Sequence, residues 1–255
     1  TPNLVVRPSK EYGTSGQQAV FGQQIEFGNV MLTKPKHTEK DGGTEDYLFV
    51  SDARGLLQCV QMGTIEFHGW GARTGAVEKP DRMVFDLDPD EGLDFADVRE
   101  AAMDLRKHLA DIGLSSFAMV TGGKGVHVVV PLTPGHSWDA NKSFSERFAK
   151  ALAQAEPDRF TATMSKAKRK GKIFIDYLRN QRGASTVAAY SARARPGLPV
   201  SVPITRNELA KLEGADQWNI LNVQERLQEQ TADPWSDYGA TRQTITARLL
   251  KTLDV

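Results

Sequence analysis

The sequence of 255 residues contains a single cysteine, no long apolar run and no net charge. Because Cys59 has no partner cysteine, an internal disulfide is excluded, and its apolar neighbours predict a position in the core. No segment approaches the ~20 apolar residues of a membrane span, and residues 1–4 lack the start of a secretory signal. We therefore expect a soluble cytoplasmic protein without a membrane partner.

A net charge of zero argues against a nucleic-acid partner, but the charges are segregated along the chain. Residues 81–104 contain nine Asp or Glu and two arginines, whereas residues 159–195 contain ten Lys or Arg and one acid, Asp176. This arrangement favours an acidic site for cations beside a basic face for phosphates. Two solvated surfaces would explain the same pattern, so the motifs have to decide between them.

Hydrophobic periodicity predicts an α/β (mixed α+β) fold, with central antiparallel or mixed sheets flanked by helices. Residues 1–45 are rich in turn formers and offer only strand-like pieces at 19–21 and 24–27. We expect the catalytic domain over 46–255, with 1–45 as its N-terminal part, arranged in one or two lobes. Strands are expected over 47–50, 64–68, 82–88, 116–120, 126–130 and 172–177, and helices over 54–62, 95–112, 138–154, 206–212 and 222–230.

Asp86 and Asp88 lie at the end of an apolar strand, two residues apart. Side chains at i and i+2 of a strand project from the same face, so the two carboxylates repel each other unless a cation joins them. Oxygen ligands of this kind suit Mg²⁺ or Mn²⁺. An acidic turn at Asp88-Pro89-Asp90 is the structural alternative, and the apolar run before Asp86 argues against it.

A glycine-rich loop over residues 121–125 lies between two predicted strands. Its backbone N–H groups can approach phosphate oxygens, while Lys124 adds positive charge and Thr121 adds a hydroxyl group. The spacing differs from that of a Walker A loop, and a strand rather than a helix follows. His127 lies just beyond the loop. Alone it would be a core histidine, whereas beside a phosphate loop it is a candidate ligand.

A further apolar strand delivers Asp176 directly after a basic loop over residues 166–172. Considered alone, such a run of Lys and Arg is typical of a solvated loop. Beside Asp176 it predicts a phosphate-binding wall, which continues through Arg179, Asn180, Arg182, Arg193 and Arg195. Three carboxylates, a glycine loop and a basic wall together suit in-line phosphoryl transfer with two divalent cations.

These motifs resemble those of the archaeo-eukaryotic primase–polymerase superfamily, and further segments narrow the resemblance. Over residues 46–235 the chain looks like the polymerase domain of bacterial ATP-dependent DNA ligase D, which acts in non-homologous end joining. The segments that carry this resemblance are residues 65–71, 80–89, 121–127, 160–166, 176–180, 190–195 and 233–235.

The resemblance implies a primase-like catalytic core and a role for each matching position. Asp86, Asp88 and Asp176 would be the catalytic residues and would bind two Mn²⁺ or Mg²⁺ ions, with Asp176 nearest the primer 3′-hydroxyl. The incoming nucleotide would be held by His68, Thr121, Gly122, Gly123, Lys124, His127, Arg179, Asn180 and Arg193. DNA would be contacted by Lys166, Lys168, Arg169 and Lys170. The pocket of this family favours ribonucleotides, and Thr121 replaces its usual serine.

The same resemblance implies the partners: DNA ends or a primer–template, an NTP or dNTP, Ku, and a ligase domain, in the bacterial cytoplasm at the nucleoid. Phe21 is a candidate for base stacking, and Lys34 and Lys36 are candidates for DNA binding. Residues 1–45 follow the family pattern poorly, so no pocket for a 5′-phosphate is predicted there.

Three other functions stay open at this point: de novo priming, phosphate-ester hydrolysis with Asp86 as nucleophile, and nucleic-acid binding by a decayed site. The hydrolase motif has Thr or Val where this chain has Asp90, which weakens that alternative. The presence of three aspartates together with Lys124 and His127 argues against decay.

Overall fold

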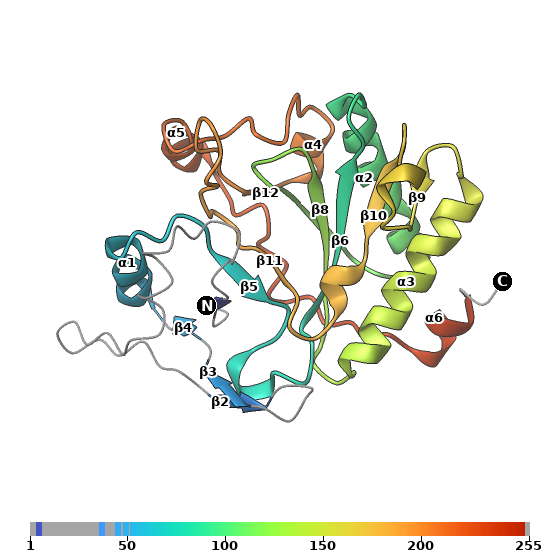
Figure 1. Cartoon of the computed structure of the whole chain (residues 1–255), viewed down its shortest axis with the longest axis horizontal. Helices are drawn as coiled ribbons and strands as arrows, with labels where there is room; N and C mark the ends of the chain where they lie inside the picture. Colours follow the sequence, from blue (N-terminus) through green and yellow to red (C-terminus); the bar gives the residue numbers. More distant parts are fainter. Residues whose placement is uncertain (1–3, 7–35, 39–43, 47, 51, 253–255) are drawn as a thin grey trace.

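The computed structural model describes residues 4–6, 36–38, 44–46, 48–50 and 52–252 (Figure 1). Six of the twelve described strands belong to one mixed sheet, which confirms the expected fold class. Its order is β12 (Val202–Ile204), β7 (Phe117–Val120), β8 (Val126–Pro131), β6 (Arg82–Pro89), β10 (Ile173–Asp176) and β9 (Phe160–Thr161). All neighbouring strands are antiparallel except β10 and β9, which run parallel.

Strand β6 lies near the centre of this sheet, and its successive side chains point alternately to the two faces of the sheet. Phe85 and Leu87 are fully buried and point to the core, so Asp86 and Asp88 project from the opposite face. Residues paired across a sheet share a face, and the pairing places His127 of β8 and Asp176 of β10 on either side of Asp86. The strand register therefore gathers the polar residues on the face away from the core.

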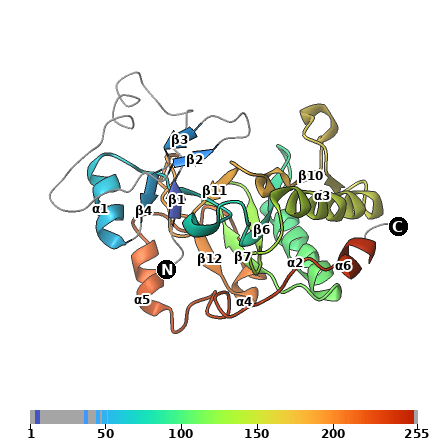
Figure 2. The ribbon, with the colours of Figure 1, turned by 90° about the horizontal axis from the view of Figure 1, so that it is seen from below.

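Two amphipathic helices cover the core face, α2 (Phe95–Asp111) and α3 (Trp138–Ala155). Figures 1 and 2 both place them beside β6 and β10, on the far side from β5. A capping box between Asp94 and Asp97 begins α2. Its buried face includes Val98 and Leu105, and the Phe85 and Phe148 rings pack 5.2 Å apart beneath α3. Burial of this apolar stripe holds both helices against the sheet.

A second, four-stranded sheet borders the polar face, in the order β11 (Ser185–Val187), β5 (His68–Trp70), β1 (Leu4–Val6) and β4 (Leu48–Val50). Strands β2 (Lys36–Thr38) and β3 (Thr44–Asp46) pair separately. Helix α1 (Ala53–Gln61) follows β4, and 3₁₀ turns η2 (Thr74–Ala76), η3 (Lys166–Lys168) and η4 (Leu178–Asn180) punctuate the loops. The short helices α4 (Arg206–Leu209), α5 (Val223–Glu229) and α6 (Ala247–Thr252) complete the chain.

Several sequence predictions are confirmed, among them the strand that carries Asp86, the hairpin around the glycine loop and the two long helices. Cys59 is buried, as predicted. Within the described residues no helix is both long and apolar enough to span a membrane. The pieces expected at 19–21 and 24–27, together with Phe21 and Lys34, lie outside the described residues, and the division at residue 45 stays a prediction.

Two element predictions are wrong. The strand expected over 64–68 runs instead over His68–Trp70, because its pairing with β11 begins at His68. The helix expected over 206–212 ends at Leu209. Strand β12 had not been predicted, since Pro203 lies within it; the strand is an edge strand, where a missing N–H donor costs nothing.

Candidate active site

A cleft of about 290 Å³ lies between the two sheets, and we call it the carboxylate cleft. The smaller sheet contributes His68, which had been predicted, and residues 185–187 of β11, which had not. From the larger sheet and its loops come Asp86, Asp88, Thr121, Gly123, Lys124, Gly125, His127, Arg179, Arg193 and Arg195. The cleft therefore unites segments that span more than half of the chain.

The carboxylates occupy two neighbouring strands. Asp86 of β6 lies directly opposite Asp176 of β10, and Asp88 follows on the same face nearer the strand end. Their side chains differ in exposure: 18% for Asp86 and 13% for Asp176, but 53% for Asp88. Asp86 and Asp88 thus line the cleft, whereas the more buried Asp176 lies beside Asp86 on the neighbouring strand and is not among the lining residues.

Two arginines and one histidine face these carboxylates. Arg179 Nε lies 3.2 Å from Asp176 Oδ2 and 3.7 Å from Asp86 Oδ2. His127 Nε2 lies 3.4 Å from Asp86 Oδ1. Arg169 Nη1 donates to Asp88 Oδ2 at 3.3 Å, and its guanidinium group stacks on the Phe174 ring at 3.8 Å. Every acid of the cleft therefore has a protein cation beside it, and the positions of these cations decide its protonation.

The pKa values of the acids move in opposite directions. Burial works to raise the pKa of Asp86, but His127, Arg179 and Arg193 outweigh it and hold that pKa below its usual range. Burial, followed by repulsion from Asp86, raises the pKa of Asp88. Burial also raises the pKa of Asp176, against the attraction of Arg179. The negative charge of Asp86 is therefore stabilised by its neighbours, whereas ionisation of Asp88 and Asp176 is less favourable than in water.

This donor set fits hard divalent cations, because carboxylate oxygens are their preferred ligands and a cation would relieve the charge on Asp88 and Asp176. Among the residues described, however, no three acidic, histidine or cysteine side chains already lie close enough to hold one ion. Arg179 and Arg169 occupy the space beside the carboxylates instead. The types of ligand therefore suit a divalent cation, but the described side chains are not arranged around one ion position.

The glycine loop packs tightly against β6. A Cβ atom at Gly125 would lie 2.5 Å from the carbonyl oxygen of Leu87, so only glycine allows this approach. Gly122 adopts a φ of +66°, and a Cβ there would meet Arg193 at 2.9 Å. Buried Thr121 donates its hydroxyl to Gly125 O at 3.0 Å, whereas Lys124 is exposed at the mouth of the cleft. The loop is thereby rigid, with its charged residue directed at solvent and cleft.

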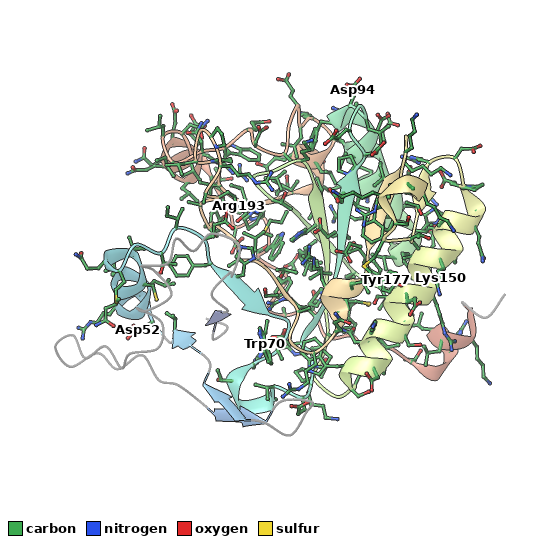
Figure 3. The ribbon with its side chains drawn as sticks, viewed as in Figure 1. Asp52, Trp70, Asp94, Lys150, Tyr177 and Arg193 are labelled. Carbon is green, nitrogen blue, oxygen red and sulfur yellow. The ribbon has the colours of Figure 1, made fainter. Side chains whose placement is uncertain are left out.

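Glu66, to which no role had been assigned, links the two sides of the cleft. Its Oε2 lies 2.8 Å from His68 Nε2, and its Oε1 accepts from Ala194 N at 2.7 Å and lies 3.2 Å from Arg193 Nε. Arg193 in turn donates to Thr121 O at 2.6 Å, and Figure 3 labels it between β5 and the larger sheet. Burial opposes ionisation of Glu66, but these donors lower its pKa. The spacing of two residues between Glu66 and His68 was the available signal.

Two residues of the predicted wall lie elsewhere. Asn180 is buried, and its amide group bonds to Val84 N and Val84 O, both at 2.7 Å, so it fastens η4 to β6 and does not line the cleft. Arg182 pairs with Glu78 at 2.8 Å, also outside the cleft. The structure therefore does not bring Asn180 or Arg182 to the carboxylate cleft, and their contacts to nucleotide and phosphate stay predictions.

The basic loop divides into two parts. Arg169 points to Asp88 in the carboxylate cleft, as described above. Lys168 and Lys170 line a separate hollow together with Lys172, and Lys166 is exposed beside it. The predicted DNA-binding residues thus do not form one surface.

The mixed sheet and its carboxylate cleft define the class of protein, a mixed α/β domain with an acidic cleft bordered by a glycine loop and arginines. A family model described as LigD, primase-polymerase domain matches residues 10–235, and the chain belongs to this family. The match begins at residue 10, so the family region extends further towards the N-terminus than the predicted start at residue 46.

Individual relatives agree with this family. The chain is 49% identical over 214 residues to the multifunctional non-homologous end joining protein LigD of Pseudomonas aeruginosa, which covers 84% of this chain and 26% of that protein. It is 35% identical over 217 residues to the protein of the same description from Mycolicibacterium smegmatis, covering 83% of this chain and 28% of that protein. The chain therefore spans about a quarter of the length of these curated relatives.

A solved structure supports the same assignment. The polymerase domain from Mycobacterium tuberculosis ligase D, in complex with DNA, superposes with a TM-score of 0.75 at 30% identity. The alignment covers 94% of this chain and 84% of that one. The fold described above is therefore that of the ligase D polymerase domain.

Proposed function

We propose that this chain is a primer-extending, DNA-directed polymerase that transfers nucleotides to the 3′-hydroxyl of DNA ends in non-homologous end joining. The observation that carries the proposal is the gathering of Asp86, Asp88 and Asp176 on two adjacent strands beside the glycine loop. Its setting is the bacterial cytoplasm, at the nucleoid, with Ku and a ligase domain as partners, in line with the end-joining relatives.

Two divalent cations, Mn²⁺ or Mg²⁺, are proposed as cofactors, with the three aspartates as their ligands. When bound, such ions lower the pKa of an attacking hydroxyl and neutralise a triphosphate. Arg179 and Arg169 compensate the same carboxylates in the protein alone, so their guanidinium groups have to give way to the cations or to substrate.

The protein's own groups hold the nucleotide. Lys124 at the cleft mouth and the N–H group of Gly123 are suited to the triphosphate, and Arg193 adds a fixed positive charge. The N–H group of Gly122 donates instead to Ala215 O at 3.1 Å, so Gly122 shapes the loop. His68, oriented by Glu66, is suited to the sugar and is the proposed origin of a ribonucleotide preference. His127 keeps Asp86 ionised as a ligand.

Extension of a labelled primer–template by the chain with Mn²⁺ and either NTPs or dNTPs tests the proposal. We expect addition of ribonucleotides in preference to deoxyribonucleotides, with no product from Asp86→Ala. Release of inorganic phosphate from small esters without extension would establish the hydrolase instead, and products formed without a primer would establish de novo priming. Either result overturns the proposed function.

A further inference from the structure

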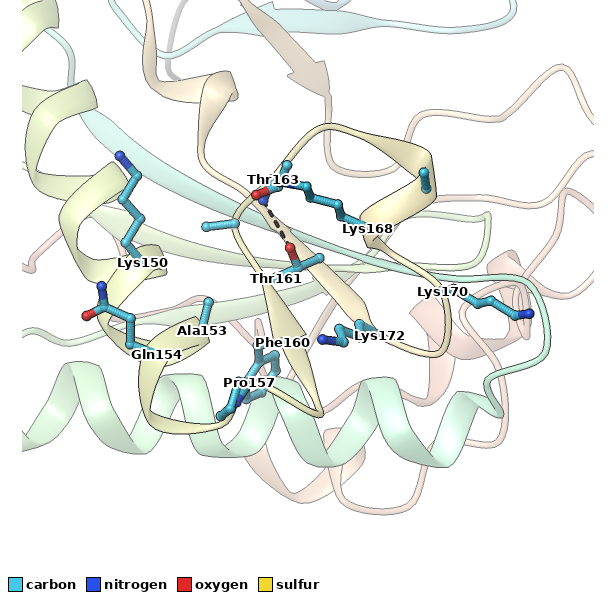
Figure 4. A pocket seen from close by; sticks show the side chains of 12 residues that line it. Lys150, Ala153, Gln154, Pro157, Phe160, Thr161, Thr163, Lys168, Lys170 and Lys172 are labelled. Atoms are coloured by element: carbon cyan, nitrogen blue, oxygen red, sulfur yellow. Dashed lines mark hydrogen bonds between the residues drawn. The ribbon is translucent and has the colours of Figure 1, made fainter.

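Beyond the outer strand β9 the surface forms a second hollow of about 540 Å³, which we call the lysine groove (Figure 4). It lies between the C-terminal half of α3 and the loop over 166–172. Its polar lining residues are Lys150, Gln154, Thr161, Thr163, Lys168, Lys170 and Lys172. The groove is therefore strongly basic, and it is distinct from the carboxylate cleft in every residue that lines it.

Three of the four lysines that line the lysine groove have no paired carboxylate among the described residues. No carboxylate is among its lining residues within the described chain. Glu146 pairs with the fourth lysine, Lys150, at 2.7 Å, and Asp90 accepts from Gly171 N in the loop at 2.8 Å. Figure 4 shows Lys168 and Lys172 directed across the groove, whereas Lys170 points outward. Lys168 and Lys172 therefore supply most of the field inside it.

The lysine groove is joined to the carboxylate cleft by the strand register. Thr161 of β9 pairs with Phe174 of β10, which pairs with Asp88 of β6, so the three residues form one row on the polar face. Neighbouring strands are ~4.8 Å apart, which places Thr161 roughly 10 Å from Asp88. Arg169, stacked on Phe174 and bonded to Asp88, covers the middle of this row. Arg169 is thus the one cationic side chain that the described residues place along this row, between the carboxylates and the groove.

We propose that the lysine groove is a second phosphate-binding site, which holds the phosphodiester backbone of a nucleic-acid strand whose reacting end lies at the carboxylates. Lysine ammonium groups are mobile point charges, which suit phosphate contacts that do not depend on base sequence. The aromatic lining residue, Phe160, is buried, so the groove offers no ring for base stacking. That the bound anion is nucleic acid rests on the proposed function; the basic character of the groove does not.

The double variant Lys168→Gln, Lys172→Gln tests the proposal against a control double variant, Lys107→Gln, Lys211→Gln, which removes two exposed lysines from elsewhere on the surface. Fluorescence anisotropy of a labelled primer–template is measured over a range of salt concentrations, without nucleotide or divalent cation. We expect affinity to fall about tenfold at ~100 mM salt and the slope of log K against log salt to fall by about one to two. At saturating primer–template, the KM for nucleotide should not change.

A double variant with the affinity and salt slope of the control would overturn the proposal. So would weaker binding of inorganic phosphate, measured by calorimetry, with unchanged oligonucleotide affinity, since the groove would then be a small-anion site. Because this assay measures binding alone, absence of primer extension by the unmodified chain would remove the proposed function and leave the groove standing. The two hypotheses therefore fail in separable ways.

Discussion

The carboxylate cleft lies on the polar face of the larger sheet and the lysine groove at its β9 edge, and their charges are organised in opposite ways. In the cleft each acid has a cation within 3.7 Å, and the residues come from both sheets. In the groove one sign of charge is presented by two short segments at the sheet edge. Opposed, partly buried charges suit chemistry that requires fixed orientation, whereas exposed charges of one sign suit the retention of a polyanion.

The strongest way to separate the two regions is to remove a carboxylate. In Asp176→Asn we expect the rate of primer extension to fall by roughly 10³-fold or more, because loss of a metal ligand removes several kcal/mol of transition-state stabilisation. Affinity for the primer–template, measured by anisotropy without divalent cations, should be unchanged or slightly tighter, since a negative charge is lost. Substantial extension by this variant would show that Asp176 is not a catalytic ligand.

Replacement of Arg193 should have the next largest effect. Arg193 lines the carboxylate cleft, but it carries positive charge, like the lysines of the groove. Arg193→Ala should raise the KM for nucleotide by about 10- to 100-fold, the usual range for a lost charged hydrogen bond, while DNA affinity changes little. The matched control is Arg182→Ala, whose guanidinium group pairs with Glu78 outside the cleft. Steady-state kinetics and anisotropy measure the two quantities, and an unchanged KM would remove Arg193 from the nucleotide site.

Glu66 is expected to act through Arg193 and His68, so its effect should be smaller. Glu66→Gln preserves the size of the side chain but removes the charge that orients both partners. We expect a rise of up to about tenfold in the KM for nucleotide with a smaller change in kcat, and no effect from the control Glu78→Gln. In a double-mutant cycle the effects of Glu66→Gln and Arg193→Ala should be less than additive. Full additivity would assign Glu66 a merely structural role.

The sequence could predict the residues that follow local patterns, but not the contacts between distant parts of the chain. Asp86, Asp88 and Asp176 were recognisable because strand alternation and apolar flanks are local patterns. The contact between Glu66 and Arg193 joins residues more than a hundred positions apart, so it depends on a register that no local pattern reveals. Asn180 and Arg182 carry side chains suited to phosphate, but packing assigned them to Val84 and Glu78.

The lysine groove shows the same limit for a surface. The sequence shows three of its lysines in a basic stretch and the fourth in a predicted helix. It does not show that these lysines lie apart from Arg169. That separation follows from β9, where two residues alone pair with β10 and bring Thr161 beside Phe174. A strand this short leaves almost no periodic pattern in the sequence.

The smallest expected effect compares Asp86 with Asp88 in the metal-free protein. The raised pKa of Asp88 means that the folded state holds its proton more tightly than the unfolded state does, so stability is lost as pH rises through that pKa. The lowered pKa of Asp86 has the opposite sign: its contribution is present at neutral pH and is lost as pH falls through the folded pKa. Neutralising the two residues should therefore shift the melting temperature in opposite directions.

Thermal unfolding with a chelator, between about pH 4 and pH 8, measures these shifts. At neutral pH Asp88→Asn should raise Tm by about 1–2 °C, a small gain because its side chain is half exposed and screened. Asp86→Asn should lower Tm, because His127 and Arg179 would lose their counter-charge. Both differences should shrink towards acid pH. If both variants shifted Tm in the same direction, the two carboxylates would not differ in compensation, and the division of the cleft into one stabilised and one strained acid would be wrong.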